Sequence, residues 1–205
     1  MLITIFALIV LVFSVVLHEI AHGFCAFCLG DPTAKYAGRL SLNPLKHLDF
    51  LGSFFLPLFT LLVTGGQGPI FGFAKPVPIN PYNFRDQRWG ELKVAIAGPA
   101  ANFFVATIFG LSMRFFSLPH FLFVAFSIIT FYNFLWGVFN LLPVPPLDGS
   151  HILLSLLGKK GFEMKWIFQQ YGFLIFLLII FVGLRIVTPL ALMLFKLVVG
   201  QPFLF

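Results

Sequence analysis

Apolar residues occur in long runs along the chain, separated by polar segments that contain glycine and proline. A helix that crosses a bilayer needs about 20 mostly apolar residues, because each residue rises about 1.5 Å. Four runs are long enough or nearly so, and a shorter one follows: residues 2–29, 92–113, 121–142, 166–184 and 186–199. The pattern predicts an all-α integral membrane protein with about five transmembrane helices.

Two segments between the first and second runs do not fit a spanning helix. Residues 50–73 are apolar but repeatedly interrupted by glycine and proline, and basic residues stand on both sides of them. Both ends of this segment are therefore expected on one side of the membrane, which predicts a re-entrant segment. Residues 38–44 alternate briefly in polarity and end in a turn signal, which predicts a short membrane-associated β-hairpin.

The composition supports a membrane location. The 205 residues are 60% hydrophobic and only 10% charged, which leaves too few charges to cover a water-facing surface. The length suits a single membrane-embedded domain over residues 1–205, with no soluble regulatory domain. The net charge of +6 is spread in small groups. We therefore expect the lipid bilayer, and no nucleic acid, as a partner.

The basic residues also predict an orientation, because Lys and Arg in short loops mark the cytoplasmic side. Ten of the 13 lie in three loops: Lys35, Arg39, Lys46, Lys75, Arg85, Arg88, Lys93, Lys159, Lys160 and Lys165. With these loops on the cytoplasmic side, the chain starts outside and crosses five times. Arg114 and Arg185 then lie on the far side as interfacial anchors.

The first apolar run contains the motif H-E-x-x-H at residues 18–22. On a helix, positions i and i+4 share a face, so His18 and His22 can reach one metal ion. Glu19 lies beside that site, where a carboxylate can take a proton from the attacking water. Ionisable groups are costly in an apolar helix and indicate function. The alternative is a helix end whose histidines merely meet the membrane interface.

A catalytic zinc ion needs a third protein ligand besides two histidines. Asp148 follows the third long run and is expected at the same membrane side as His18. From spacing alone, two roles fit Asp148 equally: a metal ligand, or the N-cap of a helix over residues 150–157.

These motifs resemble the site-2 protease family of intramembrane zinc metalloproteases, in its short bacterial form without PDZ or CBS domains. The family's second motif, N-x-x-P-x-x-x-x-D-G, is present at residues 140–149. Further family elements are the segments 30–34, 38–44, 75–81 and 98–102.

The resemblance implies that His18, His22 and Asp148 bind one zinc ion per chain and that Glu19 is the general base. It further implies cleavage of a transmembrane protein or peptide substrate in or near its membrane segment. The expected location is a bacterial inner membrane, with the active site toward the cytoplasm.

Other residues near these motifs have two interpretations. Asn140 fits a contact to the substrate or the developing oxyanion, and equally a helix-packing hydrogen bond. Asn102 is ambiguous in the same way but, with Gly98, favours close helix packing. Pro143 and Gly149 are expected to shape the chain near the site.

Four further residues could bind metal but are expected not to. Cys25 is three residues past His22, yet free cysteine is usually a small buried hydrophobe, and the same holds for Cys28. His47 and His151 are expected to be loop residues, or to contact the metal ligands without binding the metal themselves.

The alternative functions are a membrane metal-binding or transport protein and an inactive pseudoprotease. A transporter needs a polar path, and the far halves of the apolar runs offer few polar residues. A protease must bind its substrate in an extended form, because helical peptide bonds are shielded, and the expected hairpin at 38–43 is the candidate edge for pairing with it.

Overall fold

The described part of the chain is almost entirely helical. The computed structural model describes residues 2–47, 49, 55, 58, 59, 62 and 75–203, with only some side chains described between 159 and 184. The helices are α1 (Leu2–Cys28), α2 (Thr33–Tyr36), α4 (Gly90–Phe115), α5 (His120–Asn140), α6 (Asp148–Leu157) and α7 (Lys159–Val199). Short 3₁₀ turns occupy Pro44–His47 and Pro81–Asn83, and no β-strand occurs among the described residues.

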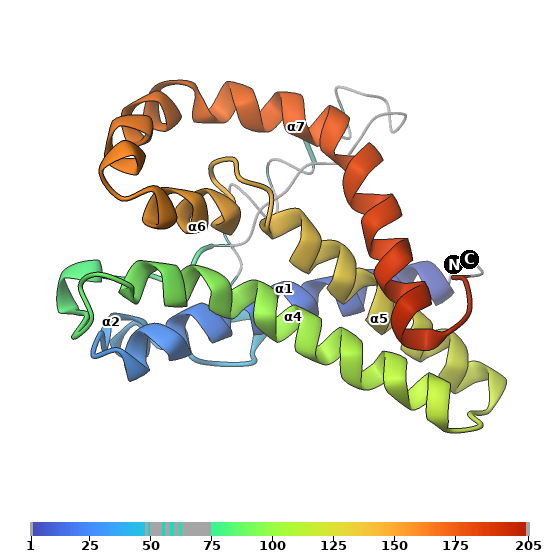
Figure 1. Ribbon diagram of the computed structural model, residues 1–205. Helices are drawn as coiled ribbons and strands as arrows, with labels where there is room; N and C mark the ends of the chain where they lie inside the picture. The colour runs from blue at the N-terminus through green and yellow to red at the C-terminus, as the bar shows by residue number, and fades with distance from the viewer. Residues whose placement is uncertain are drawn as a thin grey trace.

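Helices α1, α4 and α5 pack side by side and form the centre of the molecule (Figure 1). Helix α6 follows α5 after a short turn and contacts α4, whereas α7 passes over α6 and packs its C-terminal part on α5 and α4. The two chain ends lie at the same end of the bundle (Figure 1). The opposite end carries α2, the end of α1 and the start of α4.

The three central helices are long and apolar enough to cross a membrane. Their mean hydropathies are 2.5 for α1, 1.8 for α4 and 1.8 for α5. They coincide within a few residues with the first three predicted runs, so those predictions are confirmed. The described structure thus supports an all-helical membrane protein.

The prediction for the C-terminal region is wrong in one respect. Two separate spans were expected on either side of Arg185, but α7 is one helix of 41 residues that runs through this position. Pro189 lies inside it and removes one backbone donor without ending the helix. Long helices commonly bend at proline, and α7 changes direction along its course (Figure 1).

The expected β-hairpin at residues 38–43 is also wrong, because these residues form turns and bends. Local side-chain bonds replace a strand ladder: Asn43 Oδ1 accepts from the Leu45 N–H, and Ser41 Oγ accepts from the Asn43 N–H. His47 Nε2 donates to the Ser41 carbonyl at 2.8 Å. Polar residues that bond to nearby backbone favour turns over strands. The re-entrant segment expected at 50–73 lies almost wholly outside the described residues.

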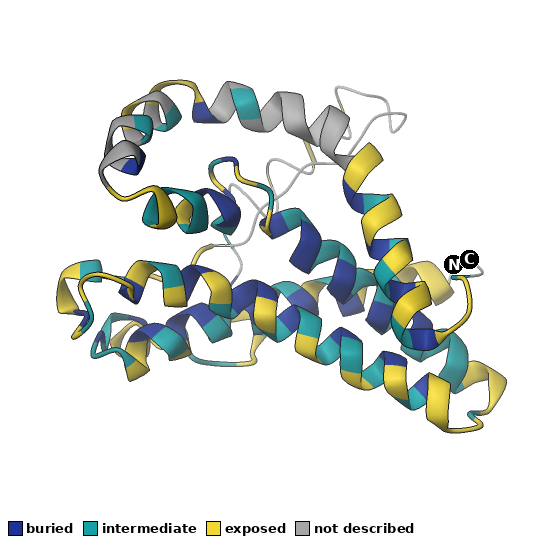
Figure 2. Ribbon diagram, in the orientation of Figure 1, coloured by how far each residue is buried: buried dark blue, intermediate teal, exposed yellow. Residues whose placement is uncertain are grey.

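The central helices bury the faces that they turn toward one another and expose their outward faces (Figure 2), and large apolar side chains are common among the exposed residues. Large apolar side chains point outward, as at Leu8 (59% exposed) and Phe104 (66% exposed), while Asn102 and Thr130 are fully buried. In lipid, helices associate through close packing and buried polar contacts rather than through the hydrophobic effect. The outer surface therefore suits contact with acyl chains.

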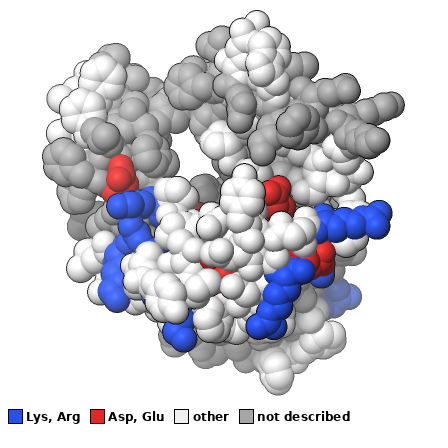
Figure 3. Space-filling view, turned by 90° about the vertical axis from the view of Figure 1, so that its left-hand side faces the viewer, with Lys and Arg blue, Asp and Glu red and all other residues white. Residues whose placement is uncertain are grey.

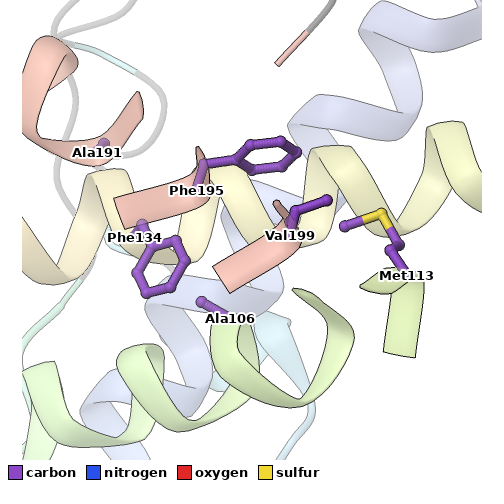
Figure 4. Close-up of a cluster of buried hydrophobic side chains, with 6 residues drawn as sticks. All are labelled: Ala106, Met113, Phe134, Ala191, Phe195 and Val199. Atoms are coloured by element: carbon purple, nitrogen blue, oxygen red, sulfur yellow. The ribbon is translucent and has the colours of Figure 1, made fainter. Parts of the chain in front are cut away.

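Close packing is visible where α4, α5 and α7 meet (Figure 4). Ala106 and Ala191 are fully buried there, and these small side chains let Phe134 and Phe195 fill the space between the helices. This apolar cluster joins α4, α5 and α7.

Candidate functional site

The centre of the candidate site is a pair of histidines on one face of α1. His18 and His22 are one helical turn apart, and both are buried. Their Nε2 atoms lie 3.0 Å from each other. The i, i+4 spacing therefore brings both rings to one point, as the sequence predicts.

Asp148 completes this cluster from another part of the chain. It is the first residue of α6, and its Oδ2 lies 2.9 Å from His18 Nε2 and 3.2 Å from His22 Nε2. The N-cap position of α6 is occupied by Leu147, and no side chain caps the helix. The Asp148 carboxylate thus points to the histidines rather than to the helix end.

Gly149 permits this placement because the backbone approaches itself closely. A Cβ at this position would lie 2.3 Å from the Leu141 carbonyl oxygen and 2.4 Å from that of Leu142. Any side chain would push the start of α6 away from the end of α5. Gly149 therefore shapes the turn that carries Asp148 to α1.

The hydrogen bonds of the two Nδ1 atoms show which nitrogen of each histidine carries the proton. His18 Nδ1 lies 2.7 Å from Asn102 Oδ1, and His22 Nδ1 lies 2.7 Å from the Val94 carbonyl oxygen. Both neighbours are acceptors, so each Nδ1 carries the proton in the neutral ring. The two Nε2 atoms therefore present lone pairs to each other and to Asp148.

Three acceptor atoms in mutual contact require a cation between them. Without a shared proton or a metal, the Nε2 lone pairs and the carboxylate oxygen repel one another, and Asp148 Oδ2 is buried without a donor. Tetrahedral ligands with bonds of about 2.0–2.1 Å are about 3.3 Å apart, close to the 2.9–3.2 Å seen here. The nitrogen and oxygen donors fit zinc.

Asn102 connects the site to all three central helices. Its Oδ1 accepts from His18, while its Nδ2 donates to the Ser14 carbonyl on α1 at 3.1 Å and to Asn133 Oδ1 on α5 at 3.0 Å. Asn133 Nδ2 in turn donates to the Ile129 carbonyl. Asn102 thus combines helix packing with orientation of the His18 ring.

Gly98 lies against both histidines from α4. A Cβ on Gly98 would lie 2.3 Å from His22 Nε2 and 2.7 Å from His18 Cε1. The absence of a side chain lets α4 approach α1 closely enough for Asn102 and Val94 to reach the rings.

Glu19 follows His18 on α1 and is half-buried. Its Oε2 accepts a hydrogen bond of 2.9 Å from the Val77 N–H, which belongs to the extended segment before α4. Among the described residues no donor reaches Glu19 Oε1. One carboxylate oxygen of Glu19 is thereby held in place by the chain before α4.

Other candidate residues do not contribute atoms to the acceptor cluster. Asn140 is buried and donates to the Trp136 carbonyl one turn earlier on α5, and Pro143 is exposed in the turn before α6. His47 is buried with its ring bonded to a backbone carbonyl, and His151 is exposed. Cys25 and Cys28 are free thiols, and Cys25 packs in an apolar cluster at the end of α1.

Two contacts of the site could not be found from the sequence. The Val94 carbonyl and the Val77 N–H are backbone groups, so their residue types carry no signal for these roles. Asn133 did carry a signal, because an amide in an apolar helix needs a buried partner. It lies 31 positions from Asn102, and the α4–α5 packing brings the two together.

Comparisons with known proteins find zinc metalloproteases among the relatives of the chain. The sequence profile described as Peptidase family M50 matches residues 117–182. "Putative zinc metalloprotease YwhC" of Bacillus subtilis is 37% identical over 198 residues, covering 90% of this chain and 81% of the relative. "Putative zinc metalloprotease Rip2" of Mycolicibacterium smegmatis is 34% identical over 166 residues, covering 79% of this chain and 61% of the relative.

A more distant archaeal relative, "Zinc metalloprotease MJ0392" of Methanocaldococcus jannaschii, is 28% identical over 157 residues. These residues cover 77% of this chain and 36% of the relative. No solved structure matches the chain. On the strength of its similarity to YwhC over most of both proteins, the chain belongs to peptidase family M50.

Proposed function

We propose that the chain is an intramembrane zinc endopeptidase that hydrolyses peptide bonds in or near transmembrane segments of its substrates. The observation that carries this proposal is the convergence of three lone-pair atoms, from His18, His22 and Asp148, with Glu19 next to His18 on the same helix. The relatives named as zinc metalloproteases support zinc as the ion.

His18, His22 and Asp148 would hold one zinc ion through Nε2, Nε2 and Oδ2. When bound, zinc polarises the substrate carbonyl and lowers the pKa of the attacking water. Asn102 and Val94 keep both rings in the tautomer that leaves Nε2 free. A ligand histidine held in this way is oriented before the ion arrives.

Glu19 would act as the general base. Oε2 is held by the Val77 N–H, so Oε1 is the atom that takes the proton as the water oxygen attacks the carbonyl carbon. The same oxygen then returns the proton to the amide nitrogen as the C–N bond breaks. The second water proton passes from the new carboxylic acid to the amine, so the products are a carboxylate and an ammonium group.

The position of the site along α1 supports a substrate bond within the membrane. At about 1.5 Å per residue, His18 lies about 15 Å from Cys28, the last residue of α1. The hydrocarbon core is about 30 Å thick, so this depth is inside it. A helical substrate segment must unwind there before its peptide bond can reach the site.

The basic residues support a site that faces the cytoplasm of a bacterial inner membrane. Figure 3 shows Lys and Arg side chains gathered at the end of the molecule that carries α2 and the start of α4. Loops rich in Lys and Arg stay on the cytoplasmic side. His18 is nearer to this end of α1 than to its N-terminus, so water would reach the site from the cytoplasm.

The proposal is tested by metal content and cleavage together. The detergent-purified chain is expected to contain one zinc ion and to cut a reconstituted single-span substrate within its membrane segment. A chelator should remove both zinc and activity, and added zinc should restore them. Zinc content is measured by mass spectrometry, and the cleavage position by peptide mass.

Two histidine variants provide the control. His22→Ala is expected to lose zinc, whereas His151→Ala, which changes an exposed histidine outside the cluster, should keep it. Full zinc occupancy in His22→Ala would contradict the ligand assignment. A zinc-loaded chain that leaves every single-span substrate intact would favour a metal-binding function instead.

Asn102→Leu should weaken zinc binding about 10- to 100-fold, because partners of ligand histidines commonly contribute that much. Leucine has a similar size but cannot accept from His18 Nδ1, and it leaves Asn133 Oδ1 without its Asn102 donor. Competition with a chromophoric chelator measures the affinity. Ser112→Ala removes only a local hydrogen bond on the same helix and should bind zinc normally. Equal affinity in both variants would exclude the orienting role.

A further inference from the structure

An extended segment connects Glu19 to the rest of the protein. We call residues 75–80 the strap. Pro76 and Pro78 are exposed while Val77 between them is buried, as expected for an extended backbone with alternating sides. A Cβ on Gly23 would lie only 2.8 Å from Val77 Cγ1, so the strap packs tightly on α1 one turn beyond Glu19. This contact places the Val77 N–H against the Glu19 carboxylate.

The end of the strap is held by a carboxylate from a different loop. Asp31 is fully buried just after α1, and its Oδ2 accepts a hydrogen bond of 2.7 Å from the Asn80 N–H. Its Oδ1 accepts from Asn83 Nδ2 at 2.7 Å and from the N–H and hydroxyl of Thr33. Asp31 thus joins the chain after α1 to the chain before α4.

Asp31 remains ionised in this setting. Burial alone would raise the pKa of Asp31, but the hydrogen bonds that it accepts, first that from the Thr33 side chain, hold this pKa below its usual value. Each oxygen meets donors only. Three donors meet Oδ1 and only the Asn80 N–H meets Oδ2, so an asparagine at this position would keep its oxygen toward Thr33 and Asn83 and turn its NH₂ group toward the Asn80 N–H, which releases the strap.

The strap is stiff, so a displacement at one end should move the other end as well. Proline at positions 76 and 78 fixes two backbone φ angles, which stiffens the segment on both sides of Val77. Its first residue is also held, because the Lys75 N–H donates to the His47 carbonyl at 2.9 Å. The Asn80 N–H that Asp31 binds is only three positions after Val77, about 10 Å of extended chain.

We propose that Asp31 is a positioning residue for the reaction: by holding the strap, it keeps the Val77 N–H on Glu19 and so orients the base. The proposal rests on the proposed role of Glu19. Asp31 touches no reacting atom and acts only through the strap. Small displacements of an oriented group can cost about 100-fold in rate.

The test compares kcat and KM for cleavage of a reconstituted substrate. Asp31→Asn should lower kcat about 10- to 100-fold with KM and zinc content unchanged, since binding and ligands are not affected. Asn83→Ala, which removes one contact and keeps the Asn80 bond, should lower kcat by a smaller factor. Asp86→Asn is the matched control: this half-buried aspartate also accepts from two backbone N–H groups, those of Arg88 and Trp89, and the change should leave kcat unchanged.

Thr33→Val distinguishes the effect of the strap from that of the local turn at Thr33. It removes only the hydroxyl donor to Asp31 and leaves the Asn80 bond in place. It should lower kcat less than Asp31→Asn does. An equal loss in Thr33→Val would show that Asp31 acts through the turn, and a rise in KM without loss of kcat would show that it shapes substrate binding. Either result overturns the proposal.

Hydrogen exchange gives a readout that does not need activity. The two prolines leave Lys75, Val77, Ile79 and Asn80 as the exchangeable amides of the strap. Asp31→Asn should speed exchange at Val77, and unchanged exchange there overturns the proposal. If the zinc-loaded native chain cleaves nothing, the proposed function fails, while the exchange result still decides whether Asp31 holds Val77 on Glu19.

Discussion

Glu19→Gln should abolish cleavage while the chain keeps its zinc. Glutamine has the same shape and can still accept the Val77 N–H through its side-chain oxygen, but it cannot take a proton from water. Loss of a general base typically costs about 10²- to 10⁴-fold in rate. This corresponds to about 3–5 kcal/mol of transition-state stabilisation. The rate of substrate cleavage in vesicles and the zinc content of the same preparation measure both halves of the prediction.

The matched control for this variant is Glu91→Gln. Glu91 is exposed in the first turn of α4, so the same chemical change there should leave cleavage at the native rate. If Glu19→Gln retains cleavage, Glu19 is not the base. If it loses zinc as well as activity, Glu19 contributes to metal binding and the division of roles on α1 is wrong.

Gly98→Ala should remove zinc binding through a single added methyl group. The new Cβ would lie 2.3 Å from His22 Nε2 and 2.7 Å from His18 Cε1, so at least one ring must leave its position. Alanine favours a helix over glycine by about 1 kcal/mol, and α4 itself should therefore form normally. We expect zinc affinity and cleavage to fall at least about 100-fold, measured by chelator competition and by the vesicle assay.

Gly137→Ala serves as the control for this steric effect. Its Cβ would lie 3.1 Å from Phe103 Cε2, an aromatic side chain that can shift slightly. It adds the same methyl group at a helix contact that does not touch the histidines, and its distance to Asn102 Cβ, 3.5 Å, is an ordinary van der Waals contact. This variant should bind zinc and cleave as the native chain does. Native zinc affinity in Gly98→Ala would mean that α4 does not approach the rings as closely as described.

The sequence predicts well those features that depend on local spacing. His18 and His22 share a face because four residues make about one helical turn, and their Nε2 atoms meet. The first three spans follow from apolar length alone and appear as α1, α4 and α5. Spacing alone did not decide whether Asp148 is a metal ligand or an N-cap, and the resemblance to site-2 proteases favoured the ligand. In the structure Asp148 lies with the histidines.

Features that depend on long-range packing could not be predicted from the sequence alone. The Asn102 amide could serve helix packing or the site, and only the α1–α4 contact shows that it does both. The 38–43 hairpin was wrong because local side-chain bonds at Ser41 and Asn43 compete with strand pairing. The strap was recognised as a family motif, but its contact with Glu19 joins residues 58 positions apart.

The order of the proposed ligands along the chain has a consequence for biogenesis. His18 and His22 emerge first from the ribosome, and their supports Val94 and Asn102 follow when α4 is inserted. Asp148 is made only after α5. A growing chain therefore carries an oriented pair of histidines without the carboxylate that completes the set. The proposed zinc site can therefore be completed only late in synthesis, after α1, α4 and α5 have been made.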